Sequence, residues 1–287
     1  MLGAIIGDIA GSPYEFNNVY KRSSVKLLEN SFLRRVRFTD DSVLSLAIGK
    51  ALTENLHETD LNRLKQKVAQ KLKEYYRKYP LKGTVFRGIP MDPYGGGFKK
   101  WAESDSYEDR KATTNGAAMR AATIGWLYDD IQKTMQVAEI TAQPTHDSKQ
   151  AIQATQAVAI TIFLARNRKS KLEIKNFLEW KFSYQLGNKI DDTMEIHKRV
   201  SDIRNQSKKY RQKALIERKF SYFIDCDAKR TVENAIYAFL ISKDFDDCIK
   251  TAISFGGDSD TIACIAGGIA EAYYGIPKNG NIKPVKC

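Results

Sequence analysis

The sequence is poor in the residues that build zinc sites and disulfide frameworks. Its 287 residues include only 3 histidines and 4 cysteines, the latter being Cys226, Cys248, Cys264 and Cys287. No two cysteines stand in a CxxC pair or in any other paired spacing, which argues against both kinds of site. We therefore expect free, buried thiols at these positions.

Long apolar runs are also missing. No stretch of about 18 residues is apolar enough to cross a bilayer. The opening MLGAIIGDIAGSPYEF lacks the basic start and the long apolar core of a signal peptide. We therefore expect a cytoplasmic protein with no membrane partner. The hydrophobic content of 43% is enough for a sizeable core.

Negative charge is outnumbered by positive charge, with 34 Asp or Glu against 46 Lys or Arg, and the formal net charge is +12. The excess is concentrated in the basic segment 166–220, which has 16 Lys or Arg against 7 Asp or Glu. Such a segment can attract nucleic acid or concentrate a polyanionic substrate, and it can equally be an ordinary solvated surface. No nucleic-acid-binding motif accompanies the charge.

Strand patterns are rare, whereas apolar residues recur with helical spacing through most of the chain. No linker rich in Pro, Gly or Ser divides the helical segments. We therefore expect one all-α domain. The predicted helices cover 43–51, 61–72, 117–128, 131–141, 150–165, 231–241, 245–253 and 260–274.

Small residues predict where two of the helical segments meet. Gly3, Gly7 and Gly11 are spaced four residues apart at the start of the chain. A similar small face, made of Ala263, Ala266, Gly267 and Ala270, lies on the last predicted helix. Small faces let helix backbones approach closely. We expect the first and last helices to pack together in the core.

Two helix starts carry acidic residues and hydroxyls. RFTDDSVLSLAIGKAL at 37–52 supplies Thr39, Asp40 and Asp41, and GGDSDTIACIAGGIAEAYYG at 256–275 supplies a matching set at Asp258, Asp260 and Thr261. Each set could simply cap its helix. If the four carboxylates converge, however, they would repel one another without cations between them. Oxygen ligands of this kind favour two divalent ions, Mg²⁺ or Mn²⁺.

These two motifs, together with IGDIAGSPYEF, NGAAMR and THDSKQAI, occur in the order typical of one family. The chain resembles the ADP-ribosylglycohydrolases over residues 1–277, with 278–287 as a C-terminal tail. The resemblance implies a single-domain orthogonal helical bundle with a binuclear Mg²⁺ or Mn²⁺ centre. It also implies an enzyme that hydrolyses the bond between ADP-ribose and an acceptor, such as an ADP-ribosylated protein.

The resemblance also implies roles for individual residues. Glu15 matches an acidic residue near the metals, and His146 matches a histidine beside the substrate, although either could have a purely local role. We expect Asp258, Glu15 and Asp41 to act in catalysis, with Asp258 and Glu15 as candidates for proton transfer. The expected metal ligands are Thr39, Asp40, Asp41, Asp258, Asp260 and Thr261, and the expected substrate-binding residues are Gly95, Gly96, Asn115, Gly116 and His146.

Three other functions share these residues in whole or in part. A catalytically silent member could bind ADP-ribose or a related nucleotide as a recognition module. A phosphohydrolase could use the same paired ions. A nucleic-acid-binding structural protein is supported by charge alone. The identity of the released product distinguishes the first two from a glycohydrolase.

Overall fold

The computed structural model describes residues 1–15, 22–27, 36–82, 84–86, 89–107, 109–187, 201, 205 and 226–277. The predicted tail 278–287 lies outside these residues, and so does most of the basic segment 166–220 beyond Gly187. Within the described ranges, no helix is long and apolar enough to cross a membrane.

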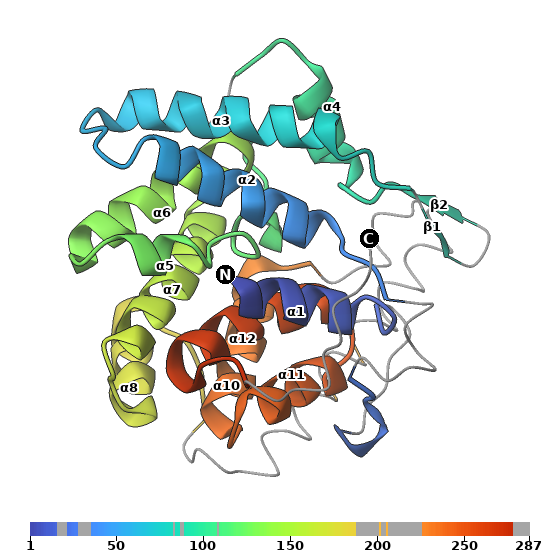
Figure 1. The fold of residues 1–287 in the computed structure, drawn as a ribbon, viewed down its shortest axis with the longest axis vertical. Coiled ribbons are helices and arrows are strands. Elements are labelled where there is room, and N and C mark those ends of the chain that lie inside the picture. The colour runs from blue at the N-terminus through green and yellow to red at the C-terminus, as the bar shows by residue number, and fades with distance from the viewer. Residues whose placement is uncertain are drawn as a thin grey trace.

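Helices dominate the described part of the chain, and one small hairpin accompanies them (Figure 1). Strands β1 (Thr84–Phe86) and β2 (Ile89–Met91) pair antiparallel. The helices are α1 (Leu2–Gly11), η1 (Arg22–Ser24), α2 (Asp40–Glu54), α3 (Leu61–Lys78), α4 (Gly96–Glu103), η2 (Asn115–Ala117), α5 (Ile124–Leu127), α6 (Ile131–His146), α7 (Lys149–Arg166), α8 (Lys171–Phe182), α10 (Ala228–Ile241), α11 (Phe245–Ser254) and α12 (Ser259–Tyr274).

The helices pack around one apolar core (Figure 1). In this view α3 and α2 lie above α1, whereas α12, α10 and α11 lie below it. Helices α5 to α8 form the left-hand side. Helix α12 is buried from Ser259 to Ala270, so it forms the centre of the bundle. The all-α prediction is confirmed.

One predicted helix is wrong. The segment 117–128 holds the end of η2, an irregular stretch and the single turn α5. Residues 117–125 are all buried, so the run of apolar residues reflects burial on every side and not one helical face. Helices α4 and α8 and the hairpin were not predicted.

Helices α1 and α12 cross through their small residues, as predicted. A Cβ atom added to Gly7 would lie 2.0 Å from the carbonyl oxygen of Ala263, and one added to Gly3 would lie 2.3 Å from that of Gly267. One added to Gly11 would lie 2.4 Å from the Cα of Asp260. Only glycine permits this approach. The crossing places the end of α1 against the first turn of α12.

The Gly7→Ala variant tests this crossing. The added methyl group cannot fit against backbone atoms, so we expect the free energy of unfolding to fall by about 1–3 kcal/mol or more. Urea denaturation measures the loss. Gly96→Ala is the matched control, because nothing lies within 4 Å of a Cβ atom built there. Equal denaturation midpoints for Gly7→Ala and the unaltered protein would contradict this account.

Candidate active site

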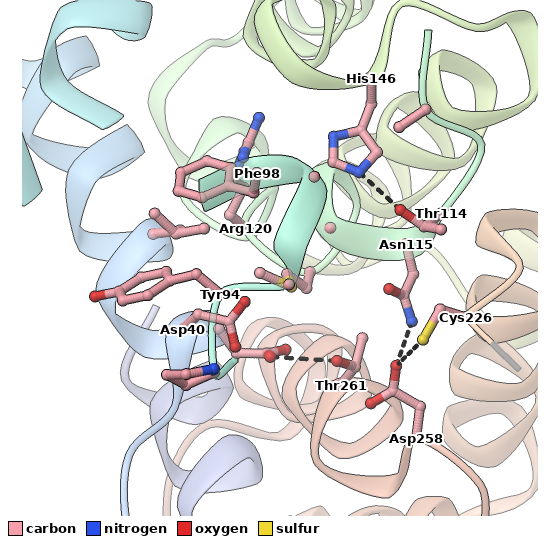
Figure 2. Close-up of a pocket in the computed structure, with 18 of the residues that line it drawn as sticks. Asp40, Tyr94, Phe98, Thr114, Asn115, Arg120, His146, Cys226, Asp258 and Thr261 are labelled. Atoms are coloured by element: carbon pink, nitrogen blue, oxygen red, sulfur yellow. Dashed lines mark hydrogen bonds between the residues drawn. The ribbon is translucent and has the colours of Figure 1, made fainter. Parts of the chain in front are cut away.

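A cavity of about 480 Å³ opens where the first turns of α2, α4 and α12 meet η2 and the end of α6 (Figure 2). All the residues expected from the sequence to form the site line it, with the exception of Thr39. Thr39 lines a second cavity of about 320 Å³, which shares Glu15, Asp40 and Asp260 with the first. The fold thus brings together residues that are more than 200 positions apart in the sequence.

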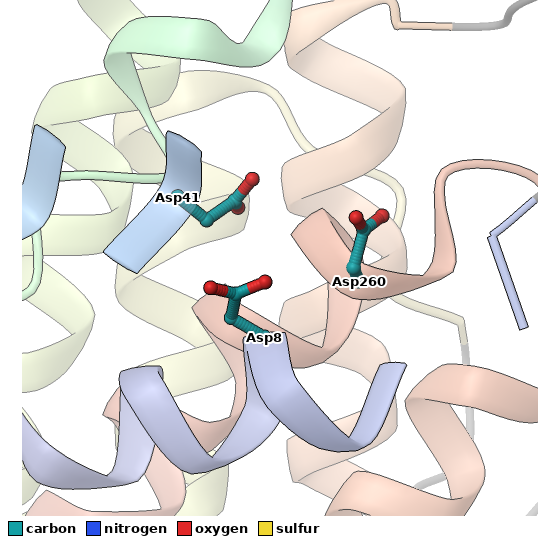
Figure 3. A group of neighbouring side chains, drawn as sticks. All are labelled: Asp8, Asp41 and Asp260. Atoms are coloured by element: carbon teal, nitrogen blue, oxygen red, sulfur yellow. The ribbon is translucent and has the colours of Figure 1, made fainter. Parts of the chain in front are cut away.

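Carboxylates gather at one end of the larger cavity in two groups of three. The first is Asp8, Asp41 and Asp260, one from each of α1, α2 and α12 (Figure 3). The second is Glu15, Asp258 and Asp260. In each group, one carboxylate oxygen per residue lies within 4.8 Å of those of the other two. Asp260 belongs to both groups.

The electrostatics of these groups favour bound cations. Burial raises the pKa of Asp41 and Asp260 well above the ordinary value, and the neighbouring carboxylates raise it further. Burial and the charge of Asp258 raise the pKa of Glu15 to about 8. The Oδ1 atom of Asp41 is buried and has no hydrogen-bond partner among the described residues. Divalent cations would supply both the missing charge and the missing partner.

Asp8 was missed in the sequence analysis. Its carboxylate accepts hydrogen bonds from the backbone N–H of Thr39 at 2.9 Å and from that of Ser42 at 3.1 Å. The hydroxyls of Thr39 and Ser42 donate to it as well. Asp8 therefore anchors the first turn of α2 to α1. The signal in the sequence is a single charged residue in the otherwise uncharged helix LGAIIGDIAG.

The start of α2 combines capping with a place in the site. Thr39 is the N-cap residue, and its Oγ1 accepts from the Asp41 N–H at 3.2 Å, so the capping interpretation is confirmed for Thr39. Asp40 lies outside both carboxylate groups but lines both cavities. Burial, and then the charges of Asp8 and Glu15, raise its pKa well above the ordinary value.

Asp258 is held by two donors that reach it from other segments. The Asn115 Nδ2 atom donates to its Oδ2 at 2.8 Å, and the Cys226 thiol donates to the same oxygen at 3.2 Å (Figure 2). Cys226 is only half-buried, so the expectation of a buried thiol is wrong there, whereas Cys248 and Cys264 are buried. Cys287 lies outside the described residues.

Asn115, expected to bind substrate, makes its contacts within the protein. Its backbone N–H donates to the Cys226 carbonyl at 2.9 Å and is therefore not free for a diphosphate. Its side chain, through Asp258, contributes to the carboxylate end of the cavity instead. Gly116 packs against His146, because a Cβ atom there would lie 2.9 Å from the imidazole Cε1.

His146 is the last residue of α6, and it is buried. Burial lowers its pKa well below the ordinary value, and the positive charges of Arg120 and Arg110 lower it further. The imidazole is therefore neutral. A local role for His146 is not that of a helix cap, since Ser148 caps α7; its ring bonds instead to its neighbour Thr145 and to Thr114.

An aromatic wall stands opposite His146. Tyr94 and Phe98 stack with ring centroids 5.9 Å apart and an interplanar angle of 20°. Between them Gly95, with φ of +72°, begins the turn into α4, and nothing lies within 4 Å of a Cβ atom built at Gly95 or Gly96. The open glycine backbone therefore borders the cavity. The two rings were not singled out in the sequence, although PYGGGFKKW places aromatic residues on both sides of the glycines.

The sequence is similar to one protein family and to several individual proteins. The profile of the family described as ADP-ribosylglycohydrolase matches residues 1–279. ADP-ribosylhydrolase ARH3 of Mus musculus is 29% identical over 96% of this chain and 83% of its own length. The protein of that name from Homo sapiens is 28% identical over 96% and 84%, respectively. An uncharacterized protein of Archaeoglobus fulgidus is 25% identical over 97% and 88%.

The fold is similar to that of a solved structure named ADP-ribosylglycohydrolase-related protein complex. The TM-score is 0.64 at 18% sequence identity, and the match covers 96% of this chain and 87% of that one. At this identity the likeness concerns the fold alone. The family profile, which spans nearly the whole sequence, shows that the chain belongs to the ADP-ribosylglycohydrolase family.

Proposed function

We propose that this member of the family cleaves the glycosidic bond between ADP-ribose and an acceptor at a binuclear centre of Mg²⁺ or Mn²⁺ and releases ADP-ribose. The observation that carries the proposal is the pair of carboxylate groups that share Asp260 at one end of the larger cavity. Two cations would be bridged by such a residue. Acidic side chains and hydroxyls are the donors that these ions prefer.

Asp41, Asp258 and Asp260 would hold the ions, with Glu15, Thr39, Asp40 and Thr261 beside them. When bound, the ions would supply Lewis acidity to a water molecule and orient ribose hydroxyls. The unpartnered Oδ1 atom of Asp41 supports this assignment. Asp8 has a different role, because its carboxylate already accepts four hydrogen bonds from the start of α2.

The two cavities suggest how the substrate lies. The ADP-ribose portion would occupy the larger cavity, with its diphosphate against Gly95, Gly96, Gly116 and His146. The acceptor would leave through the smaller cavity, which is lined by Arg37 and other residues. The scissile bond would then lie where the cavities join. ADP-ribosylated protein side chains are the substrates that the family implies.

Glu15 and Asp258 are the candidates for proton transfer, and Asp41 is the third residue assigned to catalysis. Glu15 lies where the cavities join and lines both. Its one ion pair is loose, with 3.5 Å between Oε2 and the Arg37 Nη2 atom. Asp258 is instead fixed by Asn115 and Cys226. Glu15 is therefore better placed to exchange a proton with water, and Asp258 to hold an ion.

Calorimetric titration with Mg²⁺ or Mn²⁺ tests the binuclear centre. We expect two ions per chain for the unaltered protein and a loss of both sites in Asp260→Asn, because that carboxylate belongs to both groups. Asp129→Asn serves as the control, since the Asp129 side chain is 95% exposed and distant in sequence from every ligand. Two sites of unchanged affinity in Asp260→Asn would contradict the assignment of Asp260 as a ligand of both ions.

Activity on ADP-ribose attached to arginine, serine or a nucleic-acid end tests the reaction. We expect metal-dependent release of intact ADP-ribose, reduced about 10²- to 10⁴-fold in kcat by Glu15→Gln because a proton-transfer group is lost. Mass analysis identifies the product. Tight ADP-ribose binding without release from any conjugate would favour the recognition module, and AMP with ribose phosphate would indicate a phosphohydrolase.

The stability of the metal-free protein should depend on pH. Glu15 has a pKa of about 8 in the fold against an ordinary 4.5, so the folded state binds more protons between those values. Stability is therefore greatest at low pH and is lost as the pH rises through about 8. We expect the urea midpoint in EDTA to fall from pH 5 to about pH 8 and to fall less in Glu15→Gln. A urea midpoint that rises from pH 5 to about pH 8 would contradict this prediction.

A further inference from the structure

A continuous chain of hydrogen bonds runs from the interior to the wall of the larger cavity. It begins at Arg120, whose side chain is fully buried, and passes through Thr145 and His146 on the last turn of α6. It ends at Thr114, and this last link is drawn in Figure 2. The exposed fractions are 1% for Arg120, 0% for Thr145 and 4% for His146. Water therefore has little access to the inner links.

The direction of the first two links follows from the chemistry of the groups. A guanidinium group can only donate, so the Arg120 Nη2 atom donates to the Thr145 Oγ1 atom at 2.7 Å. The buried Thr145 hydroxyl then needs an acceptor for its own proton. The acceptor it meets, within the part of the chain that the structure describes, is the Nδ1 atom of His146 at 2.7 Å. Nδ1 therefore carries no proton.

The third link follows from the second. The His146 imidazole is neutral, so its single proton is on Nε2 and is donated to the Thr114 Oγ1 atom at 3.0 Å. Gly116 holds the ring in this position, because even a methyl group there would lie 3.0 Å from Nε2.

Thr114 is exposed and lines the larger cavity. Since its oxygen accepts from His146, its hydroxyl proton is free to point into the cavity. If the links ran the other way, Thr114 would donate to Nε2 and turn only lone pairs toward the ligand. A phosphate oxygen is an acceptor with negative charge, so only the first arrangement attracts it.

We propose that Thr145 is a positioning residue that fixes the Nε2-protonated form of His146, and that Thr114 thereby becomes a hydrogen-bond donor to the diphosphate of ADP-ribose. The second half rests on the proposed function. The first half concerns the protein alone. Arg120 belongs to the same device, because it supplies the donor that determines the direction of every later link.

The first experiment needs no ligand. The ¹⁵N NMR spectrum of the His146 ring, recorded in a His57→Gln, His197→Gln background so that one histidine remains, reports which nitrogen carries the proton. We expect His146 to have a protonated Nε2 and an unprotonated Nδ1, both in the protein that keeps Thr145 and in the Thr145→Ser variant. A proton on Nδ1 would overturn the proposal whatever the protein's activity.

The second experiment measures coupling between Thr145 and Thr114. Calorimetry with ADP-ribose should give about tenfold weaker binding for Thr145→Val and for Thr114→Val. In each variant the hydrogen bond from Thr114 to the charged diphosphate is lost. In the Thr114→Val background, Thr145→Val should add less than a twofold change. Adenosine, which has no phosphate, should bind all variants alike.

Two variants guard against a merely structural effect. Thr145→Ser keeps the hydroxyl and should bind ADP-ribose like the unaltered protein. Thr141→Val removes a buried hydroxyl one turn earlier on α6, where it donates to the Ala138 carbonyl, and should also leave binding unchanged. Additive losses in the double variant would overturn the proposal. A failure of the unaltered protein to bind ADP-ribose would overturn the proposed function and the role of Thr114, but not the assignment of the His146 proton.

Discussion

Mutual repulsion among buried carboxylates is the constraint on which the rest of this structure depends. Asp41 and Asp260 lie in the same buried group, where burial raises their pKa values and the neighbouring carboxylates raise them further. The fold opposes this repulsion with a close helix contact, the crossing of α1 and α12 at Gly7. Close backbone packing there holds the acidic ends of the two helices together.

The acidic residues divide according to their partners. Asp8 is surrounded by donors from the start of α2, so it acts within the protein. Asp41 keeps an oxygen without a partner, and Glu15 borders both cavities, so these two are directed toward something that the protein binds. The residues of the opposite wall divide in the same way. His146 makes hydrogen bonds within the protein, whereas Thr114 faces the larger cavity.

The sequence predicted the all-α class and the α1–α12 contact, because periodicity and small-residue spacing are local signals. That the acidic starts of α2 and α12 meet was expected only from the family resemblance. The sequence did not reveal the hydrogen bonds of Asp8, since burial inside a helix does not indicate a partner 31 residues away. The segment 117–128 misled for a related reason, because full burial removes the periodicity that marks one helical face. The link from Arg120 to Thr145 depends on side-chain directions that no sequence pattern specifies.

The crossing of α1 and α12 also bears on the order of folding. It joins the first helix of the chain to the last described one, so the apolar glycine face of α1 has no partner until nearly the whole chain has been synthesised. Contacts of such long sequence separation form late, because the loop between them must close first. Asp8 and Asp41 therefore meet Asp260 only when this long loop closes, and in the open chain they are held apart from it, in water, where they do not repel it.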